Sequence, residues 1–298
     1  MQRFLKHIIV TLMLFPSLVI AQEYTINFDD LDRESTKALD LSNKNLTDIP
    51  KEVFEFINLE KLNLRNNNLK EIPKEISQLN TLKILDLSMN GITEIPVELF
   101  DLSNLEKLYF GDQLRYRFFS ESAKRQNFIE EIPKEIGNLD KLRELDFSYN
   151  LIRSIPTEIE KLVNLEKLSF TNNRITELPN TIGSLKQLMW LHIERNKLTA
   201  LPNELTDLKN LRELYLNTNY IEALPKSMGK FENLNTLSIS NNRLRTIPES
   251  VGDILLLSTL DISNNRIESL PRDLKFLKHL NNFYRSGNLI ENYEITNH

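Results

Sequence analysis

The sequence of 298 residues contains no cysteine. This absence excludes thiol nucleophiles, thiolate zinc sites and disulfide bonds, so the chain must fold by burying apolar surface alone. Only 4 histidines are present, and none stands at metal-ligand spacing with another histidine or a carboxylate. Glycine-rich phosphate loops and the G-x-S-x-G nucleophile motif are also missing. We therefore expect no catalytic residue, no metal site and no cofactor.

An excess of basic residues is missing as well. The formal net charge is -5 at pH 7, whereas a protein dedicated to nucleic acid normally carries a basic field that displaces phosphate counterions. We therefore expect no nucleic-acid partner.

The first 21 residues are typical of a secretory signal peptide. Arg3 and Lys6 precede an apolar run from Ile8 to Ile20, and the segment contains no acidic residue. The run is shorter than the roughly 20 residues that a membrane-spanning helix needs. We expect cleavage after Ala21 and a secreted, periplasmic or cell-surface protein without a transmembrane span. The alternatives are an uncleaved N-terminal anchor and a cytoplasmic scaffold in which this segment is no signal.

A single 23-residue period covers the rest of the chain, for example in LEKLNLRNNNLKEIPKEISQLNT from Leu59 to Thr81. The unit is L-x-x-L-x-L-x-x-N-x-[LI]-x-x-[IL]-P-x-x-[IL]-x-x-L-x-x, and every proline after the first 21 residues occupies its proline position. The predicted strand positions are Leu39, Leu62, Leu85, Leu108, Leu145, Leu168, Leu191, Leu214, Leu237, Leu260 and Phe283. One interval, from Leu108 to Leu145, contains a 14-residue insertion at 113–126.

Each part of the unit has a physical role. The L-x-L alternation predicts a short strand with one buried face. Proline fixes φ and suits the first position of a short helix, such as the one beginning at Pro133. The asparagine can bond to backbone groups where the chain leaves the strand. Stacked coils would align these asparagines in a ladder of Asn67, Asn90, Asn127, Asn150, Asn173, Asn196, Asn219, Asn242, Asn265 and Asn288.

These features resemble the leucine-rich-repeat superfamily, and the segment -IP-x-x-I-x-x-L- is similar to its Ras-suppressor and disease-resistance type. The resemblance implies an α/β solenoid, a right-handed horseshoe with a concave parallel β-sheet and short helical or 3-10 segments on the convex side. Together with the signal peptide at 1–21, the repeat pattern predicts a lead-in at 22–35, a repeat domain of about 11 repeats at 36–290 and a tail at 291–298. The cysteine-rich caps of exported animal members are absent, which favours a bacterial or simpler setting.

In such a fold, recognition must use the variable outward positions of the strands. Aromatic residues gather in the middle of the predicted concave face beside one arginine, so we expect partner contacts from Tyr109, Tyr149, Trp190, His192, Arg195 and Tyr215. The alternative is that they only stack across strands and stabilise the sheet. Acidic residues outnumber basic ones at the outward positions, so we expect a protein or peptide with basic and apolar groups as the partner.

The insertion is a second candidate contact. Its sequence QLRYRFFSESAKRQ is basic and aromatic, and we expect Arg115, Arg117, Phe118 and Phe119 to contribute to binding from the rim of the solenoid. Alternatively, its aromatics pack onto the scaffold, or it meets an anionic glycan or membrane surface. Asn45-Leu46-Thr47 fits the N-glycosylation pattern, although we favour an unmodified repeat residue.

The sequence therefore predicts an exported, non-catalytic protein that binds a protein or peptide through its concave face, with the insertion contributing. A surface glycan-binding adhesin, in which aromatic side chains stack on sugar rings, is the alternative from a different class.

Overall fold

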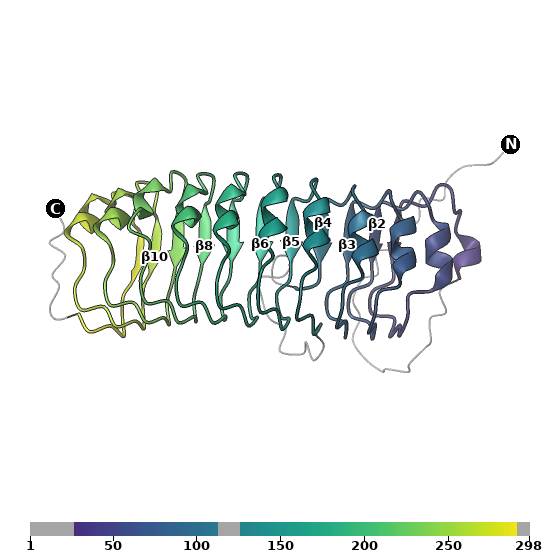
Figure 1. Cartoon of the computed structure of the whole chain (residues 1–298), viewed down its shortest axis with the longest axis horizontal. Coiled ribbons are helices and arrows are strands. Elements are labelled where there is room, and N and C mark those ends of the chain that lie inside the picture. Colours follow the sequence, from purple (N-terminus) through teal and green to yellow (C-terminus); the bar gives the residue numbers. More distant parts are fainter. Residues whose placement is uncertain (1–26, 113–125, 291–298) are drawn as a thin grey trace, which may run out of the picture.

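The computed structural model describes residues 27–112 and 126–290. Within them, eleven parallel strands form one open sheet whose strand order follows the chain. Figure 1 shows the coils stacked in a row along the longest axis, with β2 towards one end and β10 towards the other. The predicted signal peptide, residues 113–125 of the insertion and the tail lie outside the described residues, so their predictions stay predictions. No helix of the described ranges is long and apolar enough to span a membrane.

Each coil, meaning one repeat, contributes a three-residue strand. The strands are β1 (Ala38–Asp40), β2 (Lys61–Asn63), β3 (Ile84–Asp86), β4 (Lys107–Tyr109), β5 (Glu144–Asp146), β6 (Lys167–Ser169), β7 (Trp190–His192), β8 (Glu213–Tyr215), β9 (Thr236–Ser238), β10 (Thr259–Asp261) and β11 (Asn282–Tyr284).

Short 3-10 helices connect the strands. They are η1 (Phe28–Asp30), η2 (Lys51–Glu55), η3 (Lys74–Gln78), η4 (Val97–Asp101), η5 (Lys134–Asn138), η6 (Thr157–Lys161), η7 (Asn180–Ser184), η8 (Asn203–Asp207), η9 (Met228–Lys230), η10 (Glu249–Asp253) and η11 (Arg272–Phe276).

The strand register confirms the predicted period. Each predicted strand leucine lies at the centre of a strand and pairs with its equivalent in the next one, from Leu39 opposite Leu62 to Leu260 opposite Phe283. The insertion does not shift this register, because Leu108 of β4 pairs directly with Leu145 of β5. The fold is therefore the predicted solenoid with one continuous sheet.

The core is a continuous apolar column between the strands and the 3-10 helices. Consensus leucines and isoleucines fill it, and most of them are inaccessible to solvent. In the middle coils a row of phenylalanines replaces the second strand leucine. The rings of Phe110 and Phe147 stack with centroids 5.0 Å apart, and those of Phe147 and Phe170 with centroids 5.8 Å apart. Burial of this shared column is what holds neighbouring coils together.

The predicted asparagine ladder is confirmed. The side-chain amide of Asn173 donates to the carbonyls of Phe147 (2.9 Å) and Phe170 (3.0 Å), and its oxygen accepts from the backbone N–H of Ile152 (2.9 Å). One side chain thus satisfies three backbone groups in two coils. Asn127 joins its coils in the same way, donating to Leu87 and Phe110 and accepting from Ile92, so the ladder passes the insertion.

The predicted place of the prolines is wrong by one residue. Pro133 has φ -57° and ψ 142°, so its backbone is extended, and η5 begins at Lys134. Its carbonyl accepts from the N–H of Ile136 at 3.0 Å. Proline therefore caps the 3-10 turn from outside, where its ring fixes φ and its missing N–H leaves no donor unsatisfied.

The N-terminal coil has a cap of its own. The ring of Phe28 packs against Phe56 with centroids 6.1 Å apart, and the guanidinium of Arg33 lies 5.2 Å from the centre of the Phe56 ring. Arg33 also donates to the carbonyl of Leu31 at 3.2 Å and to the carboxylate of Glu55 at 3.0 Å. These contacts cover the apolar end of the first coils, which a solenoid would otherwise expose.

Candidate functional site

The residue between the two strand leucines is in most coils a short polar side chain that caps its own turn. The carboxylate of Asp146 accepts from the N–H of Ser148 at 2.8 Å, and Asp86 accepts from Ser88 at 3.0 Å. Asp86 and Asp146 are 1% and 0% exposed. Half of the acidic residues expected at the surface are thus committed to the backbone, namely Asp40, Asp86, Asp146 and Asp261, because an aspartate at this position forms a local turn.

Aromatic side chains interrupt this pattern in the middle of the sheet. Tyr109 of β4, His192 of β7 and Tyr215 of β8, like Tyr284 of β11, occupy the position that holds a short polar side chain in the other coils. The rings of His192 and Tyr215 meet edge to face, with centroids 4.7 Å apart and an interplanar angle of 62°. Both side chains are partly buried. These coils therefore place an aromatic ring where most other coils place a short polar side chain.

Tyr109 lies beneath this surface. It is 3% exposed, and its hydroxyl donates to the Oε2 atom of Glu144 at 2.5 Å. The ammonium groups of Lys107 and Lys167 lie 3.0 and 3.2 Å from the Oε1 atom of the same carboxylate. Burial alone would raise the pKa of Glu144, but the hydrogen bonds from Tyr109, Lys107 and Lys167 outweigh it and hold that pKa below its ordinary value. The expectation that Tyr109 contacts a partner is therefore corrected: its ring is a buried support.

Trp190 of β7 is partly buried, and it is the only tryptophan of the chain. The ammonium of Lys167 lies 5.0 Å from the centre of its ring. Lys167 is therefore shared between the indole of Trp190 and the carboxylate of Glu144.

A second row of residues follows the strands at their exit, directly before the ladder asparagine. The backbone is left-handed here, with φ 57° at Tyr149 and 54° at Arg195. Such a φ costs an ordinary side chain roughly 1–2 kcal/mol, whereas asparagine tolerates it. Five coils accordingly use asparagine, at Asn43, Asn66, Asn172, Asn241 and Asn264. Tyr149 and Arg195 are exceptions, as are Met89 with φ 56° and Thr218 with φ 57°, and residues with a strained backbone of this kind concentrate at functional sites.

Tyr149 and Arg195 share one electrostatic environment. Burial raises the pKa of Tyr149 to about 12; the charge of Arg195 opposes that rise, and the carboxylate of Glu194 adds to it. Burial also raises the pKa of Glu194, which accepts a hydrogen bond from the hydroxyl of Thr171 at 2.7 Å. The phenol of Tyr149 therefore stays neutral at physiological pH. Arg195 is exposed, and its guanidinium forms no ion pair with any part of the chain that the structure describes.

The structure thus brings five of the predicted residues to one surface. They come from the coils of β5, β7 and β8, and we call this surface the docking surface: Tyr149, Trp190, His192, Arg195 and Tyr215. From β4 to β8 the sheet spans about 19 Å at the usual strand spacing. The predicted residues of the insertion, Arg115, Arg117, Phe118 and Phe119, lie outside the described residues.

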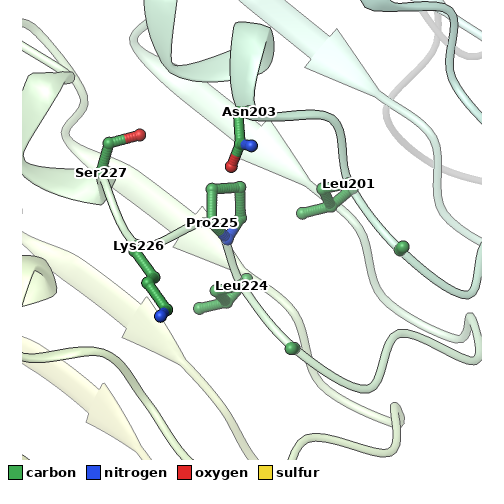
Figure 2. A pocket seen from close by; sticks show the side chains of 8 residues that line it. Leu201, Asn203, Leu224, Pro225, Lys226 and Ser227 are labelled. Atoms are coloured by element: carbon green, nitrogen blue, oxygen red, sulfur yellow. The ribbon is translucent and has the colours of Figure 1, made fainter.

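A shallow depression lies apart from the docking surface, in the turns before η8 and η9 (Figure 2). Its volume is about 560 Å³. Ala200 and Ala223 hollow it, since equivalent positions in other coils carry larger side chains such as Glu177. Leu201, Leu224 and Pro225 line it together with Lys226. None of the predicted site residues belongs to it.

The strain assigned to the left-handed backbone at Arg195 can be tested by substitution. We expect Arg195→Asn to raise the free energy of unfolding by about 0.5–1 kcal/mol, because asparagine adopts the left-handed backbone at lower cost. Urea unfolding measures this change. The control is Arg174→Asn, which replaces another exposed arginine where φ is not positive and should bring no gain. Equal effects of the two substitutions would contradict the assigned strain.

Family comparisons agree with this geometry. The sequence profile described as a leucine-rich repeat region matches residues 130–241. Two further leucine-rich-repeat profiles match residues 34–92 and residues 233–254 and 256–277. Comparison with curated proteins gives no match.

Solved structures share the fold. A leucine-rich-repeat protein of Leptospira interrogans is 29% identical, with a TM-score of 0.60, and the match covers 85% of this chain and 72% of that one. The leucine-rich-repeat ectodomain of the membrane receptor kinase GASSHO1/SCHENGEN3 from Arabidopsis thaliana, in complex with CASPARIAN STRIP INTEGRITY FACTOR 2, is 26% identical, with a TM-score of 0.69. That match covers 88% of this chain but only 38% of the ectodomain.

An internalin of Listeria monocytogenes, 23% identical with a TM-score of 0.66, shows the fold alone; the match covers 86% of this chain and 75% of that one. The unshifted strand register, the asparagine ladder and the matching profiles agree with one another. This chain therefore belongs to the leucine-rich-repeat superfamily.

Proposed function

We propose that this chain binds a protein or peptide partner through the docking surface and catalyses no reaction. The observation that carries the proposal is the group of aromatic side chains on β7 and β8 at positions that hold short polar residues in most coils, beside Arg195 with its left-handed backbone. The plant ectodomain was solved in complex with CASPARIAN STRIP INTEGRITY FACTOR 2, which supports binding as the use of this fold.

The partner would contact apolar, polar and positively charged groups on this surface. Trp190 and Tyr215 offer apolar rings with polar edges, and Arg195 offers an exposed guanidinium that the described residues leave without an ion pair. Aromatic and arginine side chains of this kind dominate the energy of many interfaces. Tyr109 supports the surface from below, and the insertion residues Arg115, Arg117, Phe118 and Phe119 would contribute from the rim.

Substitution of Trp190 tests this function. We expect Trp190→Ala to weaken partner capture from native extracts by roughly 30-fold or more, as for the loss of a central interface aromatic. The control is Phe276→Ala in η11, because Phe276 is an exposed aromatic, 51% accessible, on the helical side of the coils. Equal capture by the Trp190 variant and the wild type would contradict the proposal. Loss of glycan-array binding alone would instead favour the adhesin.

Export is part of the proposal. The mature protein would begin at Gln22 and would be secreted, periplasmic or held at the cell surface. We expect mass spectrometry of protein isolated from its native source to give an N-terminus at Gln22. An intact Met1 would contradict cleavage and favour the cytoplasmic scaffold.

A further inference from the structure

We propose that Glu144 is a positioning residue that holds Lys167 across Trp190 and thereby sets which part of the indole a partner meets. The inference rests on the proposed function, since the surface that Glu144 shapes is the docking surface. Glu144 was not among the residues that the sequence indicated.

The strand register places Glu144 at the centre of one outward row. Lys107 of β4, Glu144 of β5, Lys167 of β6 and Trp190 of β7 are consecutive partners in the sheet. A carboxylate between two lysines on neighbouring strands is a favourable cross-strand arrangement. The row therefore links the predicted aromatic Trp190 to charges three strands away.

The carboxylate of Glu144 is held by three donors. The ammonium groups of Lys107 and Lys167 share its Oε1 atom at 3.0 and 3.2 Å, and the hydroxyl of Tyr109 donates to Oε2 at 2.5 Å. Its side chain is 12% exposed, while those of Lys107 and Lys167 are 36% and 32% exposed. Glu144 is thus the buried, fixed member of the cluster, and the lysines are the ones that could move.

Lys167 needs this anchor in order to stay over the indole. A lysine side chain loses much rotamer freedom when it is fixed, and one cation–π contact with a partly exposed ring offsets only part of that loss. The ion pair with Glu144 fixes the ammonium 5.0 Å from the ring centre of Trp190. The part of the indole that Lys167 covers is closed to a partner, so Glu144 determines how Trp190 is presented.

Trp190 reports on its own surroundings, because it is the only tryptophan of the chain. We expect Glu144→Gln to release Lys167, to shift the fluorescence emission of Trp190 and to increase its quenching by acrylamide. Lys167→Met should reproduce this change. In the Lys167→Met background, Glu144→Gln should have no further effect, since a double-mutant cycle isolates the coupling between the two residues.

The matched control is Glu213→Gln. Glu213 of β8 is the other register neighbour of Trp190, so the substitution removes the same charge beside the indole without removing the anchor of Lys167. It should leave the acrylamide quenching of Trp190 unchanged. Quenching that rises equally with Glu213→Gln and Glu144→Gln would overturn the inference, as would an effect of Glu144→Gln that persists in the Lys167→Met background.

Two measurements separate the inference from the proposed function. If Glu144→Gln does not fold, as judged by circular dichroism, Lys167→Met alone decides: unchanged Trp190 quenching overturns the inference. Partner capture is a distinct readout. The expected coupling in fluorescence, together with full capture by Trp190→Ala, would support the positioning role of Glu144 and contradict the docking function.

Discussion

Replacing Asn219 with alanine should lower the free energy of unfolding by about 3–5 kcal/mol, because three buried backbone groups would lose their partner. Asn219 is 3% exposed. It donates to the carbonyls of Ile193 (2.9 Å) and Leu216 (3.0 Å) and accepts from the N–H of Leu198 (3.0 Å). Water cannot reach these groups in place of the side chain. Urea unfolding monitored by circular dichroism gives the change.

The control for this prediction is Asn210→Ala at the end of the preceding coil. Asn210 is exposed, and its amide makes one surface hydrogen bond to the carbonyl of Lys186 at 2.9 Å. The solvent can replace that bond, so we expect a loss of about 0.5 kcal/mol or less. If both alanine variants unfolded at the same urea concentration, the ladder would not have the structural role that its geometry indicates.

Gly111→Ala should destabilise the protein by about 2–3 kcal/mol, because the added methyl group has no room. A Cβ atom at Gly111 would overlap the backbone nitrogen of Ser148 and would lie 2.5 Å from the Oδ1 atom of Asp146. Neither group can move without disturbing β5 and its turn. Gly111 stands immediately before Asp112, where the chain leaves the coil for the insertion, and the carboxylate of Asp112 is bonded to Arg65 at 2.9 Å. The close approach of Gly111 to β5 therefore fixes the backbone at Asp112, the last described residue before the insertion.

Gly91→Ala provides the comparison. The nearest atom to a Cβ at Gly91 is the carbonyl oxygen of Leu69 at 3.4 Å, and the φ of Gly91 is not in the left-handed region. Alanine fits there and reduces the freedom of the unfolded chain, so we expect no loss and a gain of up to about 1 kcal/mol. Thermal unfolding of both variants checks the pair. A Gly111→Ala protein as stable as Gly91→Ala would show that β5 can shift to make room.

The repeat made most of the fold predictable. Because the same apolar positions recur every 23 residues, each coil offers the same surface to its neighbours, and the strand register follows from the period alone. The ladder was predictable for the same reason: an asparagine at each strand exit has only backbone groups within reach. Pro133 was placed one residue too far into its turn because the period fixes its position in the coil but not its ψ.

Two regularities were visible in the sequence without being recognised. The aspartates of the strands precede a serine by two residues, as in Asp86 and Ser88, and this spacing is the signal for a capped turn. Paired asparagines such as Asn172 and Asn173 mark the left-handed position before the ladder. The first signal would have separated aspartates that cap a turn from acidic side chains that do not. The second would have identified Arg195 as unusual for its position.

The role of Glu144 and the burial of Tyr109 could not be read from the sequence. Both depend on contacts between coils that differ from one repeat to the next, and on how deeply the side chains of β4 to β6 are covered. A periodic pattern specifies what the coils share. Which long side chain reaches which neighbour is decided by the particular residues of adjacent strands.

The covered first coil has a mechanical consequence. Each strand pairs only with its immediate neighbours, so a pulling force is borne by one interface at a time. At the β1 end, Phe28 and Arg33 pack on Phe56 beside the partly buried Leu31, whereas at the other end Phe283, the central residue of β11, is itself only partly buried. Under a pulling force, the described coils should unfold one after another from β11 towards β1. The stacked rings of Phe110, Phe147 and Phe170 should make the coils of β4 to β6 more resistant to unfolding.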